Sequence, residues 1–131
     1  MLVRSQTLTD QVDYAYAAVA QGPAQVVWTA GACPLDTEGN TVAVGDVAGQ
    51  AVQVMDNLAT ALGEAGAGLS DVVKTTVYVA SSSQEDLVAA WEVVRGRMGE
   101  HDAPSTLLGV AVLGYDDQLV EVEAVAVLPG A

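Results

Sequence analysis

The segment covering residues 119–127, LVEVEAVAV, restricts the fold of this chain more than any other. Side chains alternate between the two faces of a β-strand, so one face carries Glu121 and Glu123 among aliphatic residues and the other face is aliphatic throughout. We therefore expect a strand that is covered on both sides. Two carboxylates on a covered strand are destabilising unless something binds them, which makes both glutamates candidates for a site.

Two segments predict amphipathic helices that alternate with strands. From Asp46 onward, apolar residues recur at steps of three and four, and Gly66 or Gly68 is expected to end this helix. A capping box of Ser82 and Glu85 is expected to begin the second helix, which Gly99 ends. The apolar stripes consist of Val47, Ala51, Val54, Met55, Leu58, Ala59 and Leu62 in the first helix and of Leu87, Ala90, Trp91, Val94 and Met98 in the second.

The remaining β-rich segments predict one mixed sheet. Gly22 and Pro23 separate two such segments and favour a hairpin, and Gly39 and Asn40 favour a second turn through a positive φ. Each helix then connects two strands as a crossover, so we expect both helices on one face of the sheet. The other face is also apolar, and we expect copies of the same chain to cover it. The expected strands are residues 13–21, 26–32, 41–45, 72–80, 105–113 and 119–127.

Length and composition exclude several classes of protein. A chain of 131 residues predicts a single domain over residues 1–131, and 51% hydrophobic residues favour an oligomer. A net charge of −13 argues against nucleic acid as a partner. No apolar run is long enough to span a membrane, and no secretory signal is visible, so we expect a cytoplasmic protein. The single cysteine, Cys33, excludes an intrachain disulfide and a multi-cysteine metal site.

Three stretches carry a resemblance to a known family. They are AGACPLD at 30–36, the long block GDVAGQAVQVMDNLATALGEAGAGLSDVVKTTVYVA at 45–80, and VEVEAVAV at 120–127. From Tyr14 to Leu128 the chain resembles the Rid family of reactive-intermediate deaminases, also labelled endoribonuclease L-PSP. The resemblance implies a homotrimer of chorismate-mutase-like α+β subunits, with a mixed sheet, two helices on one face, and ligand clefts between neighbouring subunits.

The resemblance also implies which residues line a cleft, and it shows one departure. Deaminating members bind the substrate carboxylate through an arginine in a pattern like PARSxVEVxxL, and here Ser105 fills that position within APSTLLGVAVL. A serine offers one neutral hydrogen bond in place of a charged fork, and no Lys or Arg is nearby in the sequence. The other cleft positions implied are Tyr16, Gly31, Trp91, Thr106 and Leu107, with Glu121 as the catalytic residue that handles water.

Each of these residues also has a purely structural interpretation. Glu121 and Glu123 can be carboxylates bound by neighbouring donors, which we favour for Glu123, and Trp91 and Tyr16 can be packing residues. Cys33 lacks an adjacent base, which argues against a nucleophile. His101 follows a helix and favours a solvated or capping role. No clustered ligands predict a metal or a cofactor.

Three functions remain open from the sequence. The first is hydrolytic deamination of a small imine, enamine or related reactive metabolite, with Glu121 handling water and without carboxylate anchoring. The second is a trimer that binds a small metabolite without converting it, and the third is a chaperone-like trimer with exposed apolar patches. A ribonuclease is disfavoured, because the net charge of −13 opposes an RNA path.

Overall fold

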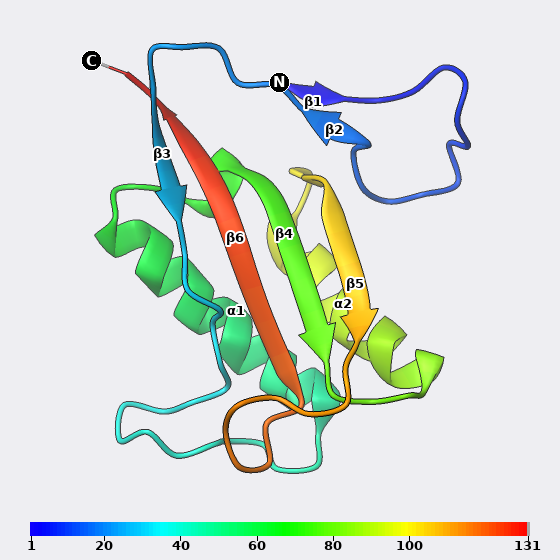
Figure 1. Cartoon of the computed structure of the whole chain (residues 1–131), viewed down its shortest axis with the longest axis vertical. Coiled ribbons are helices and arrows are strands. Elements are labelled where there is room, and N and C mark those ends of the chain that lie inside the picture. Colours follow the sequence, from blue (N-terminus) through cyan, green and yellow to red (C-terminus); the bar gives the residue numbers. More distant parts are fainter. Residues whose placement is uncertain (131) are drawn as a thin grey trace.

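A mixed four-stranded sheet with two helices on one face forms the body of the protein (Figure 1). The structure is a computed structural model that describes residues 1–130. The strand order is β3-β6-β4-β5, and only the β4–β5 pair is parallel. Its elements are β3 (Ala24–Trp28), α1 (Val47–Glu64), η1 (Leu69–Asp71), β4 (Val72–Val79), α2 (Gln84–Met98), β5 (Ser105–Gly109) and β6 (Val120–Pro129).

β6 confirms the alternation that the sequence predicts. Its residues Val120, Val122, Ala124 and Ala126 are buried against the helices, and the residues between them are only partly buried. The helices contribute Ala51, Val54, Met55, Leu58 and Leu62 from α1 and Ala90, Val94 and Met98 from α2 to the same core. Both helical stripes are therefore confirmed as the faces that cover the sheet.

Local signals set the ends of the helices. The Asp46 carboxylate accepts a hydrogen bond from the Gly49 N–H at 3.0 Å and begins α1, and Gly66 with φ of +87° follows its end. The predicted capping box of α2 is wrong. Ser83 occupies the N-cap without a side-chain bond, and the Ser81 hydroxyl instead ties the start of the helix by donating to Asp86 and accepting from the Ser83 N–H. Gly99 ends α2 as predicted, with φ of +63°.

The predicted hairpin across Gly22 and Pro23 is also wrong. Only Ala17–Ala18 of residues 13–21 form a strand, β2, and it pairs with β1 (Leu2–Val3) in a separate two-stranded sheet. Because β1 at the N-terminus pairs with β2, the backbone groups of β2 are not available to β3, and β3 pairs with β6 alone. The strands expected at 41–45 and beyond Gly109 are wrong as well. Thr41 makes an isolated bridge to Leu35, and β5 ends where its partner β4 ends.

One face of the sheet, here named the open face, has no helix over it within residues 1–130 (Figure 1). Trp28 is 73% exposed on this face, so the single chain leaves a large aromatic side chain in solvent. The prediction that copies of the chain cover this face stays a prediction. No helix within residues 1–130 is long and apolar enough to cross a membrane. The open face consists of Val26, Trp28, Lys74, Thr76, Tyr78, Thr106, Leu108, Glu121, Glu123, Val125 and Val127.

Candidate functional site

Glu121 lies where two long loops meet at one end of the sheet. The loop between β3 and α1, cyan in Figure 1, and the loop between β5 and β6, orange in Figure 1, lie side by side at this end. The Thr41 hydroxyl of the first loop donates to the Asp116 carbonyl of the second at 2.8 Å. Residues distant in sequence, from Gly31 to Glu121, are thereby brought together.

Two amides on α1 hold these loops in place. The Asn57 amide donates to the carbonyls of Cys33 and Leu35 at 2.8 and 2.9 Å. The fully buried Gln50 donates to the Asp117 carbonyl at 2.9 Å and accepts from the Leu119 N–H at 2.7 Å. Buried amides with satisfied donors and acceptors fix backbone positions firmly. Helix α1 therefore sets the position of both loops relative to β6.

The Glu121 carboxylate has a different environment at each oxygen. Its Oε1 accepts from the Gln118 amide at 3.1 Å and lies 3.3 Å from the Cys33 thiol. Its Oε2 lies over Gly31 so closely that a Cβ added there would be 2.3 Å away. We name Gly31, Cys33, Gln118 and Glu121 the Glu121 cluster. Gly31 and Glu121 were expected at one site, and the structure brings them into contact.

Cys33 is a protonated thiol in this cluster. Burial first, and then the Glu121 carboxylate, raise the pKa of Cys33 to about 11. The thiolate is the nucleophilic form, so this cysteine is a poor nucleophile at neutral pH. His101 lies elsewhere, where its Nε2 donates to the Val72 carbonyl at 2.6 Å and its N–H bonds the Met98 carbonyl near the end of α2.

Glu123 accepts a hydrogen bond from the Tyr78 hydroxyl at 2.6 Å, as expected of a carboxylate with a structural role. The contact raises the pKa of Tyr78, chiefly through the hydrogen bond to Glu123 and further through burial. The two glutamates of β6 share the open face but differ in their donors.

The aromatic candidates form a second group near α2. Trp91 donates from its indole N–H to both Asp13 carboxylate oxygens at 3.1 Å, and Tyr14 packs edge-on between Trp91 and Tyr16. The Tyr16 hydroxyl donates to the Thr9 carbonyl at 2.5 Å. Both side chains thus have partners within the chain.

Ser105, Thr106 and Leu107 on β5 divide between the two faces of the sheet. Ser105 and Leu107 pair with the buried Thr75 and Val77 and point to the helix side, where the Thr75 hydroxyl donates to Ser105 at 2.6 Å. Thr106 points to the open face and accepts from the Lys74 ammonium at 2.6 Å. The sequence offered no sign of this lysine, since the residues are 32 positions apart and only parallel pairing of β4 and β5 joins them.

The predicted site residues therefore fall into separate groups within one chain. Gly31 in the loop after β3 contacts Glu121, Thr106 lies with Lys74, and Ser105 and Leu107 face the helix side. Tyr16 and Trp91 each pack edge-on against Tyr14. Cys33 and Gln118 are neighbours of Glu121 that the expected set did not include. Gln118 stands three residues before Glu121, a spacing that points to no contact in an extended strand.

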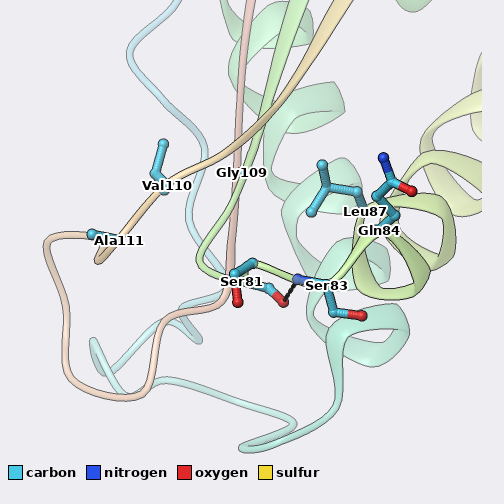
Figure 2. A pocket seen from close by; sticks show the side chains of 8 residues that line it. Ser81, Ser83, Gln84, Leu87, Gly109, Val110 and Ala111 are labelled. Carbon is cyan, nitrogen blue, oxygen red and sulfur yellow. Dashed lines mark hydrogen bonds between the residues drawn. The ribbon is translucent and has the colours of Figure 1, made fainter.

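A hollow of about 540 Å³ lies between the end of β5 and the start of α2 (Figure 2). Figure 2 shows Leu87 pointing from α2 toward it, and Gly109 is required because a Cβ there would be 2.7 Å from the Ser81 carbonyl oxygen. None of the predicted site residues lines it. Its lining consists of Ser81, Ser82, Ser83, Gln84, Leu87, Gly109, Val110 and Ala111.

Within residues 1–130, no three His, Cys, Asp or Glu side chains are grouped to hold a metal ion.

Comparisons with known proteins show which family this sequence and fold resemble. Residues 7–128 match the model of the family described as Endoribonuclease L-PSP. A RutC family protein of Pyrococcus abyssi is 36% identical over 100 residues, which are 76% of each chain. The structure of the Rid family protein YyfB from Yersinia pestis superimposes with a TM-score of 0.84 at 27% identity over 98% of both chains. TdcF of E. coli, solved with bound serine, gives 0.69 at 27% identity over 90% of this chain and 96% of its own.

Proposed function

Because this chain belongs to the endoribonuclease L-PSP, or Rid, family, we propose that it deaminates small imines or enamines by hydrolysis. The reaction adds water to a C=N bond and then expels ammonia, so that an imine R₂C=NH becomes R₂C=O and NH₃. An enamine reacts after its carbon is protonated. One group must take a proton from water and return a proton to the nitrogen. A fixed carboxylate is suited to both transfers.

The observation that carries the proposal is the uneven environment of Glu121. Two protein donors face Oε1, whereas Oε2 lies over the Cα of Gly31. A carboxylate with one oxygen bound has a defined orientation, and its other oxygen can accept a proton from a water molecule in line with the C=N carbon. Cys33 is protonated and His101 is bonded elsewhere, so Glu121 takes the acid–base role.

We further propose that the substrate is not anchored through a carboxylate. Ser105 stands at the position of the family's arginine, and its hydroxyl is engaged with Thr75 on the helix side of the sheet. Lys74 is the nearest basic side chain along the sheet, and its ammonium donates to the Thr106 hydroxyl on the face opposite to Ser105. The three arginines are paired with Asp102, Asp13 and Asp56. No arginine is therefore free to bind a carboxylate beside Ser105 in the described part of the chain.

The cleft itself is proposed to form between copies in a homotrimer. The aromatic group of Tyr16 and Trp91 lies near α2, whereas Glu121 lies on the open face at one end of the sheet. An exposed Trp28 and the valines beside it favour burial of the open face against another copy. Assembly would bring the Glu121 cluster of one copy to the aromatic group of the next.

A matched pair of imines tests the proposal. An amine oxidase converts 3-methylbutylamine to an imine without a carboxylate, and an amino-acid oxidase converts leucine to the corresponding imino acid. We expect the protein to accelerate ammonia release from the first imine much more than from the second. Equal acceleration would contradict the claim about carboxylates, and acceleration of neither would contradict the deaminase proposal. Sedimentation of the same sample should give the mass of a trimer.

One observation favours a second candidate, a trimer that binds a metabolite without converting it. The similar protein TdcF was solved with serine bound, which is an amino acid and not an imine. A binder of this kind should show a higher Tm with amino acids or keto acids and recover them unchanged. A chaperone-like trimer should show no ligand-dependent shift in Tm.

A further inference from the structure

We propose that Gln118 and Cys33 are positioning residues that commit Oε1 of Glu121 to the protein and leave Oε2 as the reactive oxygen. This inference rests on the proposed function of Glu121 and adds to it the groups that control the carboxylate. Both residues reach Glu121 from the two loops that meet at the end of the sheet.

Gln118 can take only one orientation. It is 4% exposed, and its Oε1 accepts from the Tyr115 N–H at 3.1 Å. Its Nε2 donates one hydrogen to the Val120 carbonyl and the other to Glu121 Oε1, both at 3.1 Å. A flipped amide would set its oxygen against two acceptors and its NH₂ against an N–H. The amide therefore holds its donor toward Glu121 permanently.

Cys33 supplies the second donor. Its Sγ lies 3.3 Å from Glu121 Oε1 and 3.4 Å from the Gly31 carbonyl oxygen, and a thiol has one hydrogen to give. The carboxylate is the stronger acceptor because it is charged. Asn57 fixes the loop through the Cys33 carbonyl at 2.8 Å, so the thiol cannot withdraw easily.

Together the two donors occupy Oε1 and leave Oε2 without a protein donor among residues 1–130. The absence of a side chain at Gly31 lets Oε2 lie close against this residue, since a Cβ there would be 2.3 Å away. Oε2 keeps its hydrogen-bonding capacity for a water molecule or a substrate nitrogen, whereas Oε1 already has two protein donors. Loss of either donor would let the carboxylate rotate and share proton transfer between two poorly aligned oxygens.

Paired substitutions test the role of each donor. Gln118→Met keeps the volume and removes the amide, and Gln84→Met at the exposed start of α2 is the matched control. For the 3-methylbutylamine imine we expect Gln118→Met to lower kcat by about 10- to 100-fold with little change in KM, because misplacement of a catalytic group has effects of this size. Cys33→Ala should lower kcat in the same manner. Cys33→Ser, which keeps a donor, should retain most of it.

A readout that needs no activity separates this inference from the proposed function. Cys33 is the only cysteine, so its rate of alkylation by iodoacetamide reports on the cluster alone. The Glu121 carboxylate raises the pKa of Cys33. We therefore expect faster alkylation at pH 8 in Glu121→Gln, which removes the charge, and in Gln118→Met, which lets the carboxylate move away from the thiol, with Gln84→Met unchanged.

Two results would overturn the positioning role. One is unchanged alkylation in both Glu121→Gln and Gln118→Met. The other is a Gln118→Met protein that melts at a lower temperature but keeps the kcat of the wild type. If the wild type hydrolyses no imine but the alkylation rates change as expected, the proposed reaction is wrong and the arrangement of the cluster is confirmed.

Discussion

Gly31→Ala is expected to displace the Glu121 carboxylate while leaving the fold intact. A Cβ at position 31 would be 2.3 Å from Oε2, 2.5 Å from Cδ and 2.8 Å from Cγ of Glu121. Ordinary contact begins near 3.4 Å, so the carboxylate must move by about 1 Å, further than its hydrogen bonds to Cys33 and Gln118 can stretch. The atoms in conflict belong to the end of a flexible side chain. We therefore expect a loss of about 1–2 kcal/mol in the free energy of unfolding, in the lower part of the roughly 1–3 kcal/mol that overpacking typically costs.

The assay combines urea unfolding with alkylation of Cys33 at pH 8. Movement of Glu121 removes one cause of the raised pKa of Cys33, so Gly31→Ala should react faster than the wild type while still unfolding cooperatively. Gly63→Ala is the matched control, because a Cβ at Gly63 in α1 meets nothing within 4 Å. It should leave the alkylation rate unchanged and stabilise the protein slightly. An unchanged alkylation rate in Gly31→Ala would refute the reasoning that Gly31 sets the position of Glu121.

Three further predictions follow from other contacts. The pKa of Cys33 is about 11 in the folded protein, against 9.0 for an ordinary cysteine. At pH 8 the folded protein should therefore be alkylated about 100-fold more slowly than the protein unfolded in urea. Equal rates would contradict the pKa shift. Gln50→Leu should lower the free energy of unfolding by about 2–4 kcal/mol, because it leaves the Asp117 carbonyl and the Leu119 N–H without partners. A loss below about 1 kcal/mol in urea unfolding would contradict the role of Gln50 in holding the loop before β6. Arg4 lowers the pKa of Asp102 below 3.8, so their pair stabilises the N-terminal segment above that pH and is lost as the pH falls through the folded value. The protection factors of the β1 and β2 amides, which correct for the intrinsic slowing of exchange in acid, should fall as the pair is lost, and Asp102→Asn should remove this pH dependence.

The periodic parts of the fold could be predicted from the sequence because each pattern was read within one segment. The stripe from Val47 to Leu62 and the alternation from Val120 to Ala126 both describe faces that bury against the same core. The hairpin across Gly22 and Pro23 could not be judged in this way. The partner of residues 17 and 18 is the start of the chain, and pairing between distant segments leaves no local signal.

In the candidate site, too, some contacts could be expected from the sequence and others could not. Gly31 and Glu121 were expected together from the family resemblance, and they are in contact. Cys33 and Glu121 are 88 residues apart, and they meet through long-range contacts, which are the Gln50 and Asn57 hydrogen bonds from α1 and the backbone bridge between Ala32 and Val122. Lys74 reaches Thr106 through the parallel register of β4 and β5. Such contacts depend on the assembled sheet and are not visible along the chain.

The most direct test of the account is ammonia release from the 3-methylbutylamine imine by Glu121→Gln compared with Glu123→Gln. The two residues lie on the same face of β6, but Gln118 and Cys33 hold Oε1 of Glu121 from the two loops, whereas Glu123 accepts from the Tyr78 hydroxyl within the sheet. We predict that Glu121→Gln loses about 100-fold or more in kcat, as expected when a general base is removed, and that Glu123→Gln stays close to the wild type. Equal rates for Glu121→Gln and the wild type, with sedimentation unchanged, would contradict the central claim.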